Sequence, residues 1–293
     1  MVMMVLMNDS RKITLATRQS ALALAQAELA GRFIESALPG SVCEILKMTT
    51  TGDRKTQWNL QEHGGKGLFT KELEDALLDG RADLAVHSAK DLPTELPEGL
   101  VLAGFLPRAD PRDVLVRRAD CPEPKSIASG SPRRREQGAM IWEDAEWREL
   151  RGNVETRLRK IAEGEADATI LAAAGLARLG IGSYDGLVFE PLSVDDMVPS
   201  AGQAAIAIEC RSADLPEFQA LFDVATSRAV GIEREFLAAF GGGCHSAVAA
   251  YFDGAILHAH LPETGRRSWD FSMVSPADRP ECVRDLVNSI KSR

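Results

Sequence analysis

A cluster of polar residues directly follows a short apolar run in the stretch 82–93. Residues 84–86 are apolar and come after a turn at Gly80, which is typical of a buried strand. Lys90 and Asp91 stand just beyond the end of that run. In open α/β sheets, ligands bind outside the carboxyl ends of the strands, so this pair is a candidate for binding or acid–base chemistry. The alternative is a solvated turn that carries an ordinary Lys–Asp pair.

Arginines recur where a predicted strand gives way to a predicted helix. Arg18 lies between a strand at 12–17 and a helix that Ser20 is expected to cap. Ser131, followed by proline, caps a second such helix, and Asn153 caps a third. The basic residues at these junctions are Arg18, Arg133, Arg134, Arg151 and Arg157.

Cations in the first turn of a helix oppose the helix dipole, whereas a bound anion is favoured there. A carboxylate ligand would resolve this conflict, because it accepts hydrogen bonds from backbone N–H groups and from guanidinium groups. A solvated basic surface is the alternative at any single junction. Repetition at three junctions of an acidic protein favours binding of carboxylates.

Composition narrows the possible partners. The 293 residues carry a formal net charge of −9, with 45% hydrophobic and 26% charged residues, as in an ordinary globular protein. This balance argues against nucleic acid and against an anionic membrane surface as partners. An anionic ligand must therefore be held by a local basic cluster. Nothing in the sequence demands an assembly, so a monomer is expected.

Cysteine usage and the N-terminus indicate the compartment. The five cysteines are odd in number, widely spaced and without a C-x-x-C pair, which suits a reducing cytosol better than disulfides or a zinc site. Residues 1–7 are apolar but lack the basic region of a signal peptide, and they are too short to span a membrane. We expect a cytoplasmic protein without a metal site.

A glycine-rich segment at 63–69 contains Lys66 and ends in Phe69. It lacks the spacing of a phosphate-binding P-loop and the Ser or Thr that follows one. We interpret it instead as a flexible lid that carries Lys66 and Phe69.

The order of predicted elements indicates two α/β units and a smaller third unit. Alternation of strands and helices favours a parallel sheet in the first unit, and a second series begins near residue 113. A tight loop at 199–203 precedes an apolar strand, which suggests a return crossing between the two units. Thr226 is the expected cap of a helix that runs to Phe240. Two strands and a helix within 247–291 indicate a small α+β domain.

Three glycines precede Cys244, which gives its backbone freedom and leaves space beside it. A small buried cysteine is one interpretation. A nucleophilic pair with His245 is discounted, because adjacent residues rarely place both groups productively.

Taken together, these segments resemble the porphobilinogen deaminase (hydroxymethylbilane synthase) family over nearly the whole chain. Each motif is weak alone, but six in the same order at these separations form a specific signal. The matching segments are 16–20, 64–74, 87–93, 131–134, 150–154 and 242–244.

The resemblance implies a fold of two α/β domains like the halves of a periplasmic binding protein, plus a smaller C-terminal α+β domain. The implied first domain is discontinuous and the third carries the cofactor cysteine. Their ranges are 11–106 with 200–220, then 110–196, then 224–293.

The resemblance also implies the activity. The family joins four porphobilinogen molecules head to tail, with loss of ammonia each time, onto a covalent dipyrromethane primer and then releases hydroxymethylbilane. By resemblance, Cys244 carries the dipyrromethane through a thioether, and Asp91 is the catalytic carboxylate, with Arg18 and Lys90 assisting. Each porphobilinogen carries two carboxylates, so several cations and hydroxyl groups must hold the chain. The candidates are Arg18, Ser20, Lys90, Ser131, Arg133, Arg134, Arg151 and Arg157.

The sequence departs from the family pattern at several positions without removing a catalytic group. Ala204 stands where the family usually has the second glycine of Gly-Gln-Gly, and residues 245–249 after Cys244 differ from the usual sequence. Ala89 and Pro132 replace the common Met and Leu. Two alternatives stay open at this point: a two-lobed solute-binding protein, and a degenerate deaminase that binds pyrrole acids without turnover.

Overall fold

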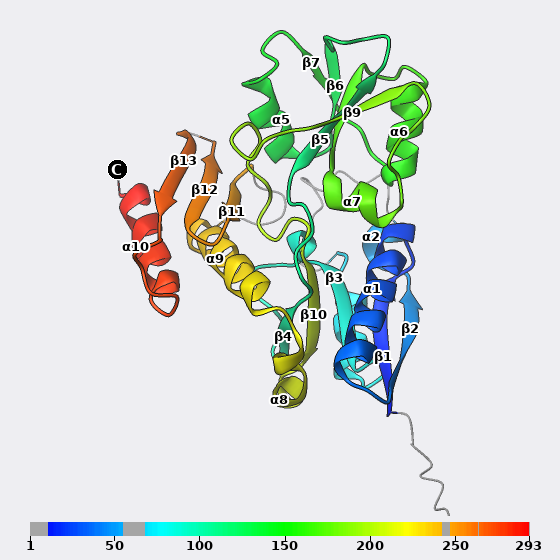
Figure 1. Ribbon diagram of the computed structural model, residues 1–293, viewed down its shortest axis with the longest axis vertical. Helices are drawn as coiled ribbons and strands as arrows, with labels where there is room; N and C mark the ends of the chain where they lie inside the picture. Colours follow the sequence, from blue (N-terminus) through cyan, green and yellow to red (C-terminus); the bar gives the residue numbers. More distant parts are fainter. Residues whose placement is uncertain (1–10, 55–67, 242–246, 263, 293) are drawn as a thin grey trace, which may run out of the picture.

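The computed structural model describes residues 11–54, 68–241, 247–262 and 264–292, and it contains three separate sheets (Figure 1). Two five-stranded α/β sheets form a lower and an upper lobe in this view, and a three-stranded sheet with two helices lies beside them. This architecture confirms the fold class predicted from the sequence. The precise domain boundaries stay a prediction.

The first lobe has the strand order β2-β1-β3-β10-β4. Its elements are β1 (Arg11–Arg18), α1 (Ala21–Ala37), β2 (Ser41–Met48), α2 (Thr51–Arg54), α4 (Lys71–Leu78), β3 (Leu84–Ser88), η1 (Ala89–Asp91), β4 (Leu100–Phe105), β10 (Ile206–Arg211), η2 (Ser212–Asp214), α8 (Leu215–Phe218) and η3 (Gln219–Leu221). Strand β1 is parallel to β2 and β3, whereas β10 is antiparallel to β3 and β4. The expected parallel sheet is therefore a mixed one, because β10 enters it from the other lobe.

The second lobe repeats this plan with the order β7-β6-β8-β5-β9. Its elements are β5 (Asp113–Arg118), β6 (Ser126–Ala128), α5 (Pro132–Ala139), β7 (Glu146–Arg148), α6 (Val154–Ala162), β8 (Ala168–Ala172), α7 (Ala173–Arg178) and β9 (Leu187–Pro191). Strand β5, which arrives from the first lobe, is the antiparallel one here. In both lobes the parallel strands end toward the space between the lobes, where ligands bind in open sheets.

The third unit is an antiparallel sheet in the order β11-β12-β13. Its elements are α9 (Val224–Phe240), β11 (Ala249–Phe252), β12 (Ile256–Leu261), β13 (Gly265–Asp270) and α10 (Arg279–Lys291). Apolar side chains from both helices and all three strands, with Phe236 fully buried among them, form its core.

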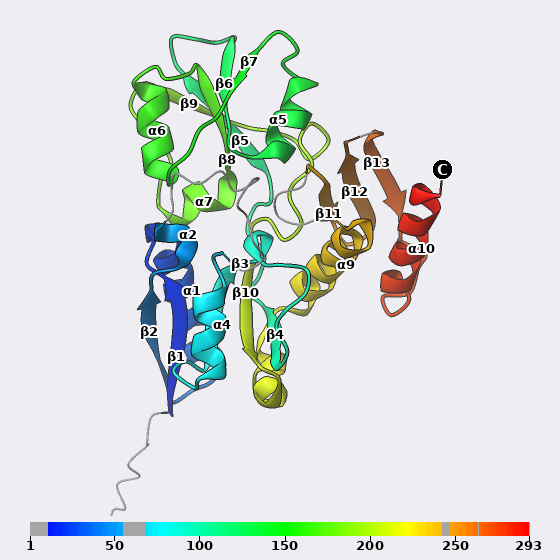
Figure 2. The same cartoon turned by 180° about the vertical axis from the view of Figure 1, so that it is seen from behind.

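Strand β3, which leads to Lys90 and Asp91, lies in the centre of the first sheet and is buried on both faces. Its Leu84 and Val86 pack with α1 on one face, and Ala85 packs with α4 on the other. Figures 1 and 2 show these two helices on opposite sides of the sheet. Burial on both faces explains why the sequence of β3 is a continuous apolar run rather than an alternating one. The residues that follow β3 therefore start from a rigid position.

Side-chain caps fix the helix starts at the lobe interface. Ser20, Ser131 and Asn153 each accept a hydrogen bond from the backbone N–H three residues later, as the sequence predicted. The expected cap at Thr226 is wrong: Asp223 caps α9 by accepting from the backbone N–H of Thr226. A capping carboxylate at a helix N-terminus is also favoured by the dipole.

A buried ion-pair network around Glu233 holds the segments that cross between the lobes. Arg108 on the outward crossing binds Glu233 of α9, with 3.1 Å between Nη2 and Oε2, and its Nε donates to the carbonyl of Gln203. Glu233 also accepts from the backbone N–H groups of Gly202 and Phe252. One fully buried carboxylate thus links both crossings to the third unit, and loss of either partner would leave a buried charge unpaired.

The return crossing contains one strained residue. Ala204 has φ of 69°, the only non-glycine residue with positive φ among those the structure describes. This conformation costs a residue with a Cβ about 1–2 kcal/mol. Replacement of Ala204 by glycine would relieve the backbone strain, but it would also remove the contacts of a buried methyl group. The two effects on stability oppose each other.

We predict that Ala204→Gly leaves the free energy of unfolding nearly unchanged. The matched variant Ala205→Gly removes an equally buried methyl without relieving strain, so it should cost about 1–2 kcal/mol. Urea unfolding of both variants measures the difference. Equal losses of stability in the two variants would contradict the strain at Ala204.

Candidate active site

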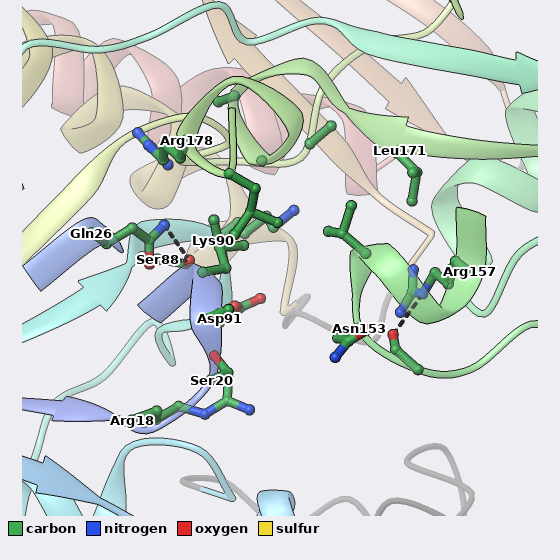
Figure 3. A pocket seen from close by; sticks show the side chains of 18 of the residues that line it. Arg18, Ser20, Gln26, Ser88, Lys90, Asp91, Asn153, Arg157, Leu171 and Arg178 are labelled. Atoms are coloured by element: carbon green, nitrogen blue, oxygen red, sulfur yellow. Dashed lines mark hydrogen bonds between the residues drawn. The ribbon is translucent and has the colours of Figure 1, made fainter. Parts of the chain in front are cut away.

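A cavity of about 720 Å³ lies between the two lobes (Figure 3). The first lobe lines it with the ends of β1 and β3 and the start of α1, and the second lobe with the ends of β8 and the starts of α6 and α7. Lys90 and Asp91 come from the first lobe, and Asn153 and Arg157 lie across from them. The site is therefore built from the strand ends and helix starts singled out in the sequence.

Lys90 brings an uncompensated positive charge into this cavity. It makes no hydrogen bond, and no ion pair within 4 Å, with any residue the structure describes. The pKa of Lys90 is lowered to about 8, mainly because the amine is removed from water and secondly because the Arg134 guanidinium is nearby. The charge of Asp91 acts in the opposite direction. A ligand carboxylate at this place would restore the charged form of the amine.

Arg18 stands at the end of β1 and is held by Asp53 and Phe69. Its Nε donates to Asp53 Oδ1 at 3.2 Å, and its guanidinium carbon lies 4.3 Å from the centre of the Phe69 ring. Burial alone would raise the pKa of Asp53, but the hydrogen bonds and charge of Arg18 hold it below the ordinary value. A Cβ on Gly52 would lie 2.2 Å from the Phe69 ring, so any larger residue there would displace this ring. Lys66, the other predicted lid residue, lies outside the described residues.

The second lobe adds Arg151 and Arg157. Arg151 pairs with Glu149 at 2.5 Å, and Arg157 Nε donates to the carbonyl of Gly152 at 2.8 Å. Burial, followed by the charges of Arg134 and Arg151, lowers the pKa of Arg157 to about 10. Arg157 has no carboxylate partner within 4 Å in the described part of the chain.

Arg133 and Arg134 are occupied by the protein itself. Both bind the buried Asp113 at the start of β5, with Nη2–Oδ distances of 2.8 and 2.7 Å. Arg133 also donates to the carbonyl of Val198, and Arg134 to that of Ile170. Burial raises the pKa of Asp113, but the two guanidinium groups outweigh it and lower the pKa to about 2.

This arrangement departs from the expectation that both arginines hold ligand carboxylates. Of the two, only Arg134 is among the residues that line the cavity, and Ser131 does not line it either. The hydroxyl of Ser131 instead accepts from the backbone N–H of Arg134 and so caps α5. Asp113 resolves the charge conflict at this helix start. Asp113 is distant in sequence from the two arginines, so no local sequence pattern predicted this pairing.

Arg178 is a cavity residue that the sequence did not single out. Its Nη2 donates to the carbonyl of Ala204 at 2.6 Å, and burial lowers its pKa to about 10. It stands in the last turn of α7, where a basic residue complements the helix dipole and attracts no notice. Gln26 and Ser88, which hydrogen-bond each other at 2.9 Å, are further lining residues missed from the sequence.

The cavity fits a bound polycarboxylate such as dipyrromethane. Lys90, Arg157 and Arg178 face it without a carboxylate partner among the described residues, while Asp91 supplies one negative charge. Buried cations of this kind are stable only when paired, so the donor set calls for several ligand carboxylates. Cys244 lies outside the described residues.

The described residues were compared with the patterns of metal sites and of membrane-spanning helices. Within the ranges 11–54, 68–241, 247–262 and 264–292, no three His, Cys, Asp or Glu side chains are grouped so that they could hold a metal ion. No helix in these ranges is long and apolar enough to cross a membrane.

The fold and site define a two-lobed α/β protein with a cavity lined by cationic side chains between its lobes. Residues 13–217 match the family model described as "Porphobilinogen deaminase, dipyromethane cofactor binding domain". The chain therefore belongs to the porphobilinogen deaminase family. Its function is that of a porphobilinogen deaminase, or hydroxymethylbilane synthase, in tetrapyrrole biosynthesis, and its cofactor is dipyrromethane.

Two curated relatives support this assignment. The porphobilinogen deaminase of Sorangium cellulosum (strain So ce56) is 45% identical over 248 residues, which are 82% of each chain. That of Caulobacter sp. (strain K31) is 44% identical over 261 residues, covering 84% of this chain and 81% of the relative. Among solved structures, the periplasmic VFT2 domain of Bordetella pertussis BvgS has a TM-score of 0.44 at 18% identity, over 75% of this chain and 91% of that one.

We predict that Lys90→Met stabilises the protein prepared without cofactor. Because the folded-state pKa of Lys90 is lowered to about 8, the cost of its buried charge is present below pH 8 and disappears toward the ordinary value of 10.5. The variant should raise the free energy of unfolding by about 1–3 kcal/mol at pH 7, and the gain should shrink between pH 8 and 10.5.

Denaturant unfolding at several pH values measures this gain. Lys71→Met, at an exposed position on α4, is the matched control and should change stability by less than about 0.5 kcal/mol. A loss of stability in Lys90→Met at pH 7 would contradict the uncompensated charge.

Proposed function

We propose that the interlobe cavity holds the dipyrromethane and the growing pyrrole chain, with Asp91 as the catalytic carboxylate. The observation that carries this proposal is the placement of Asp91 in a cavity that also contains Lys90, Arg157 and Arg178. Loss of ammonia from porphobilinogen leaves positive charge on the substrate carbon and its pyrrole ring. A fixed carboxylate beside that charge stabilises it in the transition state and accepts hydrogen bonds from pyrrole N–H groups.

The cations bind carboxylates rather than the reacting carbon. Guanidinium groups match carboxylates with two parallel hydrogen bonds, and the amine of Lys90 adds a second kind of donor. Arg18 is both a carboxylate ligand and, next to the leaving amine, a group that assists proton transfer. The proposed carboxylate-binding residues that line the cavity are Arg18, Ser20, Lys90, Arg134, Arg151, Arg157 and Arg178.

Arg133 and Ser131, predicted from the sequence as further ligands, support the site indirectly in this proposal. Their bonds to Asp113 and to the backbone of Arg134 fix the start of α5. A carboxylate that reached Arg133 would have to compete with Asp113.

Cys244 is the proposed attachment point of the dipyrromethane, through a thioether. When bound, this group supplies the terminal pyrrole carbon to which the first porphobilinogen is joined. Three glycines precede Cys244 in the sequence, so no bulky side chain stands directly before it. Phe69, stacked on Arg18, and Lys66 are the proposed lid over the site.

Porphobilinogen is the substrate that the family implies. A monomeric state, a cytoplasmic location and release of hydroxymethylbilane after four additions complete the proposal. The proposal also includes three domains, which cover residues 11–106 with 200–220, residues 110–196 and residues 224–293.

We predict that Asp91→Asn lowers turnover of porphobilinogen by about 10²–10³-fold or more, because the amide cannot offset the developing positive charge. The thermal transition should stay close to that of the parent, since Asp91 makes no hydrogen bond with a described residue. Asp79→Asn, at an exposed position, is the control and should retain full activity. Parent-like turnover in Asp91→Asn would overturn the assignment, and absence of turnover in the parent would favour a binding protein or a degenerate deaminase.

A further inference from the structure

The return crossing contacts the η1 turn, which carries Lys90 and Asp91 at the cavity. We call residues 200–205 of this crossing the junction loop. The backbone N–H of Ala89, the first residue of η1, donates to the carbonyl of Ala205 in that loop at 3.1 Å. The position of η1 is therefore tied to the junction loop as well as to strand β3, from which it continues.

Gly202 of the junction loop packs directly against this turn. Its φ is 72°, a conformation that favours glycine. A Cβ placed on Gly202 would lie 2.9 Å from the Ala89 Cβ, 3.0 Å from the Ala89 carbonyl carbon and 3.2 Å from the Lys90 backbone nitrogen. Two of these atoms belong to the backbone and the third is a methyl carbon, so no side-chain rotation could relieve the contacts.

The junction loop is anchored on the two other units of the fold. The backbone N–H of Gly202 donates to Oε2 of the buried Glu233 in the third unit, at 2.7 Å. The carbonyl of Ala204 accepts from Arg178 of the second lobe at 2.6 Å. The buried side chain of Gln203 donates to a backbone carbonyl of the outward crossing at 2.7 Å. These bonds oppose any movement of the loop away from η1.

The η1 turn is held less firmly on its cavity side. The side chains of Lys90 and Asp91 line the cavity and make no hydrogen bond or ion pair with any described residue (Figure 3). Added bulk at Gly202 would therefore displace η1 toward the cavity rather than the loop away from it. A misplacement of a reacting group by about 1 Å costs on the order of 10²-fold in rate.

We propose that Gly202 is a positioning residue for the reaction. Its lack of a side chain lets η1 pack on the junction loop at the place from which Asp91 reaches the substrate. The inference rests on the proposed role of Asp91 and goes beyond it, because the position of the carboxylate then depends on the third unit and the second lobe as well as on β3. Gly202 acts through the turn and not on the substrate.

Turnover of the Gly202→Ala holoenzyme tests this role. We expect kcat, per mole of folded protein that carries the primer, to fall at least about tenfold. The KM for porphobilinogen should change less than about threefold, because the carboxylate-binding arginines lie on other elements. Gly186→Ala is the matched control: Gly186 has a φ of 73°, so alanine imposes the same backbone strain, but its Cβ would have no contact within 4 Å. This control should keep the parental kcat and KM.

A second background shows whether the effect operates through Asp91. If Gly202→Ala acts by displacing Asp91, it should change the residual turnover of Asp91→Asn by less than about threefold, measured with primed enzyme in excess of porphobilinogen. A defect elsewhere in the protein would lower turnover by the same factor in both backgrounds.

Thermal unfolding shows whether Gly202→Ala is folded. If it is not, the double variant Gly202→Ala with Ala89→Gly removes the 2.9 Å contact and keeps the two backbone contacts. Its kcat should then be at least about threefold below that of Ala89→Gly alone.

Parental kcat in folded Gly202→Ala, an equal loss in Gly186→Ala, or the same factor in both backgrounds would overturn the positioning role. So would a kcat of the double variant equal to that of Ala89→Gly. Each of these results leaves the deaminase function intact. Parent-like turnover in Asp91→Asn would instead contradict the catalytic carboxylate on which the inference rests.

Discussion

Positive charge without carboxylate partners, held between two lobes, is the constraint on which the site depends. The chain as a whole carries a net charge of −9, yet Lys90, Arg157 and Arg178 face the interlobe cavity with no carboxylate within 4 Å in the described part of the chain. Such an arrangement costs stability until anions arrive, which makes binding of a polycarboxylate strongly favourable. Among the carboxylates that line the cavity, Asp53 is bound to Arg18, whereas Asp91 makes no hydrogen bond with a described residue and is suited to a cation formed during the reaction.

The protein pairs the buried arginines outside this group with its own carboxylates, and these pairs keep the cations of the cavity in place. Asp113 neutralises Arg133 and Arg134, and Glu233 neutralises Arg108 while tying the third unit to the return crossing. Both networks lie where the chain crosses between the lobes. Pairs of arginine and carboxylate therefore have two roles. Pairs within the protein fix the lobes, and pairs with ligand carboxylates complete the cavity.

The sequence predicted the fold class and most strand–helix junctions, because apolar runs, caps and glycine stops are local signals. It missed the mixed character of the sheets and strands such as β13 (Gly265–Asp270), since pairing between distant segments leaves no local pattern. The family resemblance supplied the roles of Asp91 and Cys244. Long-range partners decided the rest: Asp113 occupies Arg133, and Arg178 reaches the cavity from a helix end that looked ordinary.

The most direct test of a polycarboxylate held covalently in this cavity is the intact mass of the purified protein and of its Cys244→Ser variant. We predict a mass excess equal to two pyrrole units on the parent protein and none on the variant. A parent protein that is unmodified, and stays unmodified after incubation with porphobilinogen, would contradict the account.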